Sequence, residues 1–297
     1  MICACIDIGT NTTRLLVAEA DARGLRELLA QRVFTRVRHA QAPDGTIAPA
    51  KLLELVDVVT AQARAARALR ADPIVAVATA AIRAAPNRAD LVAAVRAAAG
   101  VELAVLDAER EARYAFAGAT RTRRDGPDRP IGVVDLGGGS TELVAGTAAG
   151  GVSWWRSVPV GSGTLTDRHL RADPPSPAEI AALRDHAAAA FAGLAAPPVE
   201  LALAVGGSAT SLHRLCGPRL DPATLAAALR AVTAQPCERA AADLGLAAQR
   251  VRLLPGALAV LERAAVAFDA PLEVSRGGLR EGIILSVVDE RSADGEG

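Results

Sequence analysis

The sequence of 297 residues has very few aromatic side chains and a single lysine, Lys51. Aromatics make up 2% of the chain and apolar residues 51%, so a sizeable core is possible, but Ala, Val and Leu must fill it. The formal net charge is zero. This excludes a protein that holds a polyanion through bulk positive charge. Any anion site must be a local group of arginines and backbone N–H groups.

Cysteines are also scarce, and long apolar runs are missing. The four cysteines, Cys3, Cys5, Cys216 and Cys237, include no C-x-x-C pair, which favours buried thiols in a reducing compartment over a disulfide or metal site. The sequence enters a strand without a basic leader and contains no 18-residue uncharged apolar stretch. We therefore expect a soluble cytoplasmic protein that contacts neither membrane nor nucleic acid.

Apolar periodicity predicts two successive groups of strands and helices. The first group has strands over 2–8, 14–20, 27–37, 74–78 and 102–106, and helices over 49–69, 87–98 and 107–120. Asn87 is the predicted N-cap of the second helix. The second group has strands over 131–135, 142–146, 152–158 and 201–205, and ends in a strand-turn-helix from Leu272. The charged, turn-rich segment 121–130 lies between them, so we expect domains over 1–124 and 125–297, with packing of the last helix on the first domain as an alternative.

Both groups begin with the same pattern. Residues 6–13 read Ile-Asp-Ile-Gly-Thr-Asn-Thr-Thr, and residues 134–141 read Val-Asp-Leu-Gly-Gly-Gly-Ser-Thr. In each, an aspartate between apolar residues precedes a glycine and small polar residues. Two copies at corresponding places indicate a duplicated domain. A third glycine-rich turn, Gly-Gly-Ser-Ala-Thr over 206–210, follows the strand at 201–205.

Turns of this composition suit phosphate. Glycine lets the backbone approach a ligand, and successive N–H groups can form an anion-binding nest. Asp7 and Asp135 at the mouths of the turns would repel a phosphate unless a divalent cation lay between them. Either turn alone could be an ordinary hairpin, but the pair favours phosphate binding. The predicted phosphate-binding residues are Gly9, Thr10, Asn11, Thr12, Gly137, Gly138, Gly139, Ser140, Thr141, Gly206, Gly207 and Ser208.

Further motifs accompany the turns in a fixed order. They are Val-Ala-Thr-Ala-Ala-Ile-Arg over 77–83, Glu-Ala-Arg over 111–113, Pro-Val-Gly-Ser-Gly over 159–163 and Gly-Leu-Arg-Glu-Gly over 278–282. With these motifs the chain resembles the exopolyphosphatase and guanosine pentaphosphate phosphatase (Ppx/GppA) family almost end to end. The resemblance implies an α/β fold of two ribonuclease-H-like domains, the superfold of actin, Hsp70 and sugar kinases. It also implies an active site in the interdomain cleft.

The resemblance implies a catalytic base. Where the family has Ser-Gly-x-Glu-Glu-Ala, residues 107–112 read Asp-Ala-Glu-Arg-Glu-Ala. The second glutamate is kept as Glu111, and the first is replaced by Arg110. A glutamate here can take a proton from the water that attacks phosphorus. Without the family match, Glu111 beside Glu109 and Arg113 would be interpreted as part of a charged, solvated helix face.

Further roles follow from the same resemblance. Arg83 is the implied phosphate clamp, since arginine binds phosphate oxygens in bidentate fashion. Asp7 completes the predicted catalytic set. Asp135 and Glu142 are implied to hold a divalent cation, expected to be Mg²⁺, because buried carboxylates beside phosphate need a metal or a proton.

We therefore expect a metal-dependent hydrolase that removes the terminal phosphate of inorganic polyphosphate. Guanosine pentaphosphate is the alternative substrate. A non-catalytic alarmone-binding regulator and an ATP-using kinase of the same superfold are rivals. The retained carboxylates argue against the regulator, and the lack of an acceptor-sugar signature argues against the kinase. Because the sequence continues only 15 residues beyond Gly282, we expect products to be released between cleavages, unless a homodimer lengthens the track.

Overall fold

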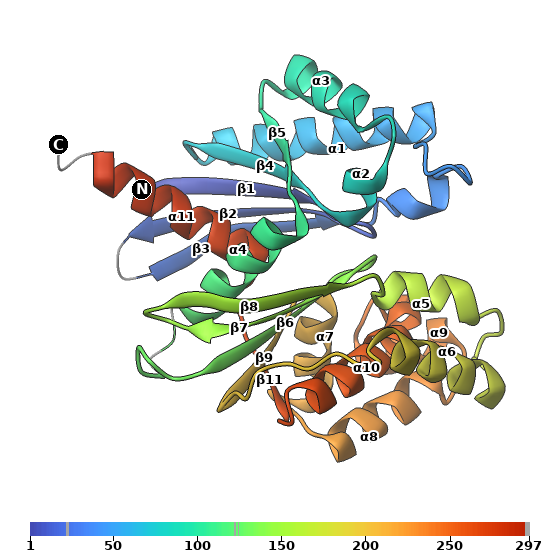
Figure 1. Ribbon diagram of the computed structural model, residues 1–297. Coiled ribbons are helices and arrows are strands. Elements are labelled where there is room, and N and C mark those ends of the chain that lie inside the picture. The colour runs from blue at the N-terminus through green and yellow to red at the C-terminus, as the bar shows by residue number, and fades with distance from the viewer. Residues whose placement is uncertain (22–23, 122, 124, 295–297) are drawn as a thin grey trace. The chain divides into compact units, whose positions relative to one another are not determined.

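The computed structural model describes residues 1–294 except 22–23, 122 and 124, and it divides into two compact α/β units (Figure 1). Unit 1 comprises Met1–Thr122 and Leu279–Gly297, and unit 2 comprises Arg123–Gly278. The last helix of the chain therefore belongs to the first unit. Each unit is built around one twisted sheet.

The sheet of unit 1 has the order β3-β2-β1-β4-β5. Its strands are β1 (Ile2–Ile8), β2 (Thr13–Asp21), β3 (Gly24–Val33), β4 (Ile74–Ala78) and β5 (Leu103–Val105). The first three strands pair antiparallel, whereas β1, β4 and β5 run parallel. The carboxyl ends of β1 and β4 thus meet at one edge of the sheet, where the predicted turn 9–12 and Arg83 both follow.

Helices cover both faces of this sheet. They are α1 (Pro49–Ala68), α2 (Ala80–Ala84), α3 (Arg88–Ala99), α4 (Ala108–Thr120) and α11 (Leu279–Asp294). Alternate residues of β1 separate the two layers: Ile6 and Ile8 join the core under α1 and α3, and Cys5 joins a smaller core with α11. Figure 1 shows α1 and α3 on the face opposite α4 and α11.

Unit 2 repeats this topology. Its strands are β6 (Ile131–Leu136), β7 (Thr141–Thr147), β8 (Gly151–Val158), β9 (Leu201–Val205), β10 (Arg219–Leu220) and β11 (Leu272–Val274). The order β8-β7-β6-β9-β11 has the same directions as β3-β2-β1-β4-β5, and β10 is added at the edge. The duplication predicted from the two turns is confirmed.

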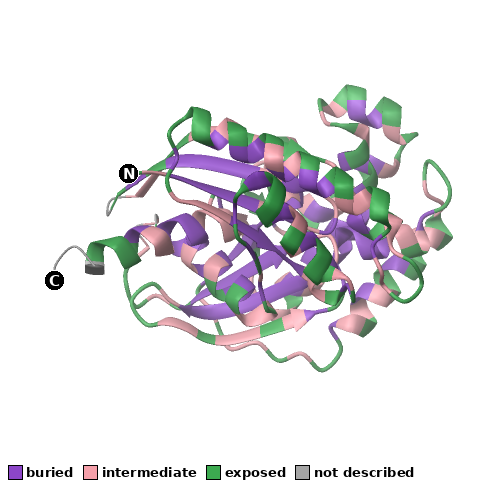
Figure 2. Cartoon of the chain, turned by 90° about the horizontal axis from the view of Figure 1, so that it is seen from above, coloured by how far each residue is buried: buried purple, intermediate pink, exposed green. Residues whose placement is uncertain are grey.

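The main core of unit 2 lies between its sheet and six helices. These are α5 (Ser162–His169), α6 (Pro177–Ala190), α7 (Gly207–Cys216), α8 (Pro222–Thr233), α9 (Cys237–Leu244) and α10 (Ala248–Ala267). The central strands are buried along most of their length (Figure 2). Within the described residues no single helix could span a membrane; α9 and α10 have the length and composition only as a pair bent by 96°.

One local prediction is wrong and another is confirmed in position only, and both differences have long-range reasons. The third strand ends at Val33 rather than at residue 37, because Arg36 adopts a left-handed conformation (φ 43°) and a 3₁₀ turn, Val37–Ala40, follows. Asn87 stands at the N-cap position of α3, but its side chain makes no cap. Instead its amide pairs with the backbone N–H and C=O of Ile47.

Candidate active site

The two predicted turns have the same internal hydrogen bond. The Gly9 amide donates to the Thr12 carbonyl at 3.0 Å, and the Gly137 amide donates to the Ser140 carbonyl at 3.1 Å. A Cβ on Gly137 would lie 2.9 Å from that Ser140 oxygen, so this turn closes only around glycine. The repeat seen in the sequence is therefore a repeat of backbone geometry.

In unit 1 the carbonyl groups of the turn accept hydrogen bonds from the segment that follows β3. The amides of Arg36 and Val37 donate to the Asn11 and Thr10 carbonyls at 3.1 and 2.9 Å. These donors lie in the segment that was predicted to be strand. The bend of the backbone at Arg36 therefore brings the amides of Arg36 and Val37 to the turn.

Unit 2 holds its turn in the same way with the start of α5. The Ser162 amide donates to the Gly137 carbonyl, and the Gly163 and Thr164 amides donate to the Gly138 carbonyl, each at 3.0 Å. A Cβ on Gly161 would approach these turn residues to 2.7 Å. The motif over 159–163 is thus the support of the second turn.

These contacts orient the amides of the turns. In a trans peptide the C=O and the following N–H point in opposite directions. With the carbonyls tied back, the N–H groups of Asn11 and Thr12 in unit 1, and of Gly138 and Gly139 in unit 2, point away from the supporting segments. None of the four donates to a backbone acceptor among the described residues. Each unit therefore presents an amide nest suited to an anion.

The hydroxyls near the turns divide into two groups. No hydrogen bond among the described residues uses the side chains of Thr10, Thr12 or Ser140, so these can donate to a ligand. The Thr141 side chain is fully buried, and its hydroxyl donates to the Val160 carbonyl at 2.7 Å. Its contact points to a structural role, so the prediction of Thr141 as a phosphate-binding hydroxyl is not supported.

Arg83 and Glu111 form an ion pair in unit 1. Arg83 Nη1 donates to Glu111 Oε2 and to the Leu106 carbonyl, each at 2.8 Å. Glu111 is 6% exposed, whereas Arg110 and Arg113 on the same helix are exposed. The alternative of a solvated charged face therefore does not apply to Glu111. The arginine stabilises the ionised carboxylate, which is the form that a general base needs.

Backbone hydrogen bonds link this pair to the first turn. Thr79, at the end of β4, donates its amide to the Ile8 carbonyl, directly before Gly9. The Leu106 amide donates to Ala78, and the Leu106 carbonyl accepts from Arg83. Among the described residues Nη1 is the only guanidinium nitrogen of Arg83 that makes hydrogen bonds. The other two guanidinium nitrogens of Arg83 can donate to phosphate oxygens.

The third glycine-rich turn occupies the place in unit 2 that Thr79 to Arg83 occupies in unit 1. Gly206 is the N-cap of α7, with φ 96°, and Gly207 and Ser208 begin the helix. A Cβ on Gly206 would lie 3.3 Å from Asp135 Oδ1. These residues therefore lie beside the second turn, with helix N–H groups that suit an anion.

Sequence reasoning missed Arg250. This arginine of α10 is 4% exposed, and its Nη1 donates to Ser208 Oγ at 3.4 Å. It places a buried positive charge behind the third turn. Residues 249–252 read Gln-Arg-Val-Arg at the polar start of α10, so no local pattern distinguished Arg250 from a surface arginine. Its contact with Ser208, which lies 42 positions earlier in the chain, could not be predicted from the sequence.

Asp7 is surrounded by charges from two elements. Arg14 stands opposite it on β2, and Arg280 and Glu281 come from the start of α11. Burial raises the pKa of the Asp7 carboxyl, while Arg14 and Arg280 oppose the rise. Its Oδ1 is enclosed and has no hydrogen-bond donor among the described residues. An enclosed carboxylate oxygen of this kind fits a cation or a protonated ligand.

Asp135 and Glu142 face each other across β6 and β7. They are direct register partners, so their side chains lie on one face of the sheet, and both are buried. Two neighbouring buried carboxylates are costly unless a cation or a proton lies between them. The described residues contain no cluster of three His, Cys, Asp or Glu side chains. A bound Mg²⁺ would take its other ligands from water and substrate phosphate, which is its usual preference. The pair fits such an ion.

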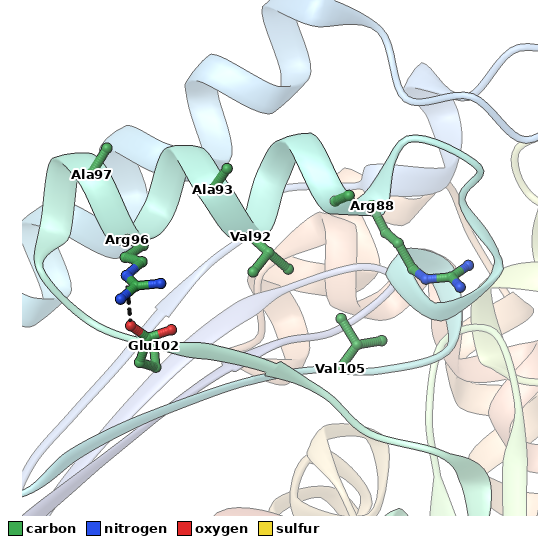
Figure 3. Close-up of a pocket in the computed structure, with 8 residues that line it drawn as sticks. Arg88, Val92, Ala93, Arg96, Ala97, Glu102 and Val105 are labelled. Carbon is green, nitrogen blue, oxygen red and sulfur yellow. Dashed lines mark ion pairs between the residues drawn. The ribbon is translucent and has the colours of Figure 1, made fainter.

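A pocket of about 750 Å³ lies elsewhere in unit 1, between α3 and β5 (Figure 3). Val92 and Val105 point into it, and an exposed ion pair between Arg96 and Glu102 closes one end. Its lining contains no predicted site residue. The pocket therefore has no part in the chemistry assigned to the turns.

The family model of the Ppx/GppA phosphatase family matches residues 16–291. The chain belongs to the Ppx/GppA family. Exopolyphosphatase 2 of Mycobacterium tuberculosis is 30% identical over 190 residues, which cover 61% of this chain and 59% of that protein. The chain thus aligns with less than two thirds of the length of the curated relatives it matches.

Solved structures agree with this membership. The Ppx/GppA family member of Aquifex aeolicus is 25% identical with a TM-score of 0.82, covering 98% of both chains. An exopolyphosphatase from Cytophaga hutchinsonii is 19% identical with a TM-score of 0.85 and the same coverage, which shows the fold alone. The predicted two-unit ribonuclease-H-like fold is confirmed, and membership of the family supports phosphatase activity. The interdomain cleft and the roles of individual residues stay predictions.

Proposed function

We propose that this Ppx/GppA protein is an exopolyphosphatase, which hydrolyses the terminal phosphoanhydride of inorganic polyphosphate and releases phosphate. The observation that carries the proposal is the duplicated turn. In each unit the turn carbonyls accept hydrogen bonds from a supporting segment, which leaves two backbone N–H groups pointing away from that segment. A chain of identical phosphates offers many equivalent oxygens to such amides. The name of the Mycobacterium tuberculosis relative is consistent with this substrate.

The residues of unit 1 would carry out proton transfer and positioning. Glu111 takes the proton from the water that attacks the terminal phosphorus, and Arg83 binds oxygens of the same phosphoryl group. Their ion pair keeps both side chains oriented before substrate binds. Asp7 lies at the end of β1 beside the amides of the first turn. Phosphoryl transfer depends on such positioning and on charge stabilisation rather than on covalent chemistry.

The residues of unit 2 would bind phosphate and the metal. Asp135 and Glu142 would hold Mg²⁺, and the turn amides, Gly207 and Ser208 would bind phosphate oxygens. When bound, Mg²⁺ neutralises charge on the phosphate oxygens. Arg250 adds a fixed positive charge behind Ser208. Both sets of residues are required for hydrolysis under this proposal.

The test is to incubate the protein with magnesium and polyphosphate, guanosine pentaphosphate or ATP in parallel and to measure released phosphate. We expect release from polyphosphate, and none in excess chelator. Glu111→Gln should lower turnover by about 10²–10⁴-fold while polyphosphate binding is retained. Glu109→Gln, a half-exposed residue of the same helix that pairs with Arg113 and not with Arg83, is the matched control and should keep full activity.

Three results would contradict parts of the proposal. Preferred release of phosphate from guanosine pentaphosphate would assign the alternative substrate. Near-normal turnover by Glu111→Gln would remove the glutamate from the reaction, whichever substrate is cleaved. Full activity in excess chelator would remove the metal role from Asp135 and Glu142.

A further inference from the structure

A row of three side chains crosses the sheet of unit 2 at the level of the predicted metal ligands. Asp135 on β6 pairs in register with Glu142 on β7, and Glu142 pairs in register with Ser157 on β8. Register partners in antiparallel strands place their side chains on the same face, so the three are neighbours. The Ser157 hydroxyl donates to Glu142 Oε1 at 2.8 Å.

This contact fixes one oxygen of a carboxylate that is almost fully enclosed. Glu142 is 1% exposed, so solvent cannot orient its carboxylate. A glutamate side chain has three rotatable bonds, and ordering it costs conformational entropy unless a donor holds it. The hydrogen bond from Ser157 to one oxygen therefore fixes the orientation of the whole carboxylate. Partners of this kind commonly set the affinity of metal ligands.

The same row in unit 1 has a different chemistry. There Asp7, Arg14 and Arg32 occupy the three positions. Arg14 replaces Glu142, and Arg32 replaces Ser157. The row of unit 1 therefore contains its own positive charges, whereas the row of unit 2 combines two carboxylates with a neutral donor. A hydroxyl at position 157 is thus a feature of the unit that needs an external cation.

We propose that Ser157 is a positioning residue that orients Glu142 to bind the divalent cation. The inference rests on the proposed function in one respect, the metal role of Asp135 and Glu142. Ser157 touches the carboxylate and not the substrate. Its loss should therefore weaken metal binding itself, before any turnover.

The experiment measures binding of Mn²⁺ alone, as a probe for Mg²⁺, by electron paramagnetic resonance without substrate. Ser157→Ala should weaken Mn²⁺ binding by about 10–100-fold, the usual effect of losing such a partner. Ser157→Thr keeps a hydroxyl and should restore most of the affinity. In a Glu142→Gln background, Ser157→Ala should cause no further loss, because the side chain through which it acts is gone. Circular dichroism verifies that each variant is folded.

Unchanged Mn²⁺ affinity in Ser157→Ala would overturn this inference and leave the proposed function intact. So would an equal loss in the Glu142→Gln background, since the serine would then act on something else. A wild-type protein that binds no Mn²⁺ would overturn both the inference and the proposed metal role. Failure of Ser157→Thr to bind better than Ser157→Ala would show that packing rather than the hydroxyl matters.

Discussion

Two histidines join the helix that supports the second turn to its neighbour. His169 is the last residue of α5, and its Nε2 lies 2.8 Å from Nδ1 of His186 on α6. Burial lowers the pKa of both imidazoles. The charges of His186, Arg168 and Arg171 lower that of His169 further, and Arg168 lowers that of His186. The first turn of α5 holds the Gly137 and Gly138 carbonyls, so this pair anchors a helix of the proposed site.

The pair should make stability depend on pH. A depressed histidine pKa means that the unfolded chain binds more protons, so stability rises with pH. The contribution of the two neutral histidines to the free energy of unfolding is fully present above the ordinary histidine pKa of about 6.5. It is lost as the pH falls toward the lower pKa values that these histidines have in the folded protein. Urea unfolding between pH 5 and 8 measures this. His186→Gln, which keeps hydrogen-bonding groups but cannot titrate, should show a shallower dependence. An unchanged dependence would contradict the assignment.

At the scale of elements, the contact between α4 and α11 depends on one glycine. A Cβ on Gly282 would lie 1.8 Å from the Tyr114 carbonyl oxygen and 3.0 Å from the Gly118 amide nitrogen. Both are backbone atoms of α4, so they cannot move aside as a flexible side chain can. The last glycine of the Gly-Leu-Arg-Glu-Gly motif therefore allows close helix packing, while Arg280 and Glu281 of the same motif lie near Asp7.

Gly282→Ala should destabilise the protein by about 3 kcal/mol, at the upper end of the cost of overpacking, since the two helices must separate. Denaturant unfolding measures the change. Glu290→Ala, an exposed substitution on the same helix, is the control and should change stability by less than about 0.5 kcal/mol. Unfolding of Gly282→Ala at the wild-type denaturant concentration would contradict the helix contact.

Elements with local signals could be predicted from the sequence, and contacts between distant residues could not. The buried strands and both turns followed from apolar patterns and glycines. The bend at Arg36 is a left-handed conformation in a residue that rarely adopts it, and it is supported by Asn11. Similarly, the burial of Glu111 and the meeting of Arg250 with Ser208 depend on tertiary packing. The sequence therefore predicted the turns of the candidate site but not their supports.

At the scale of the whole molecule, the zero formal net charge limits how a polyanion can be held. No general positive field attracts it, so binding depends on local arginines and turn amides. Affinity for long polyphosphate should fall as salt rises, with a logarithmic slope of only about −1 to −3, as for a few cationic contacts. Equilibrium binding at several salt concentrations measures it. An affinity that does not change with salt would exclude arginine contacts.

The division of unit 1 between the two ends of the chain has a consequence for protein synthesis. Residues 279–294 cover the sheet face that carries Cys3, Cys5 and Leu16, yet the ribosome makes them after the whole of unit 2. Unit 2 is one continuous segment, Arg123–Gly278, and all its residues are available earlier. The unit that is started first is therefore completed last. During translation we therefore expect the apolar face of this sheet to stay uncovered by α11 until residues 279–292 are made.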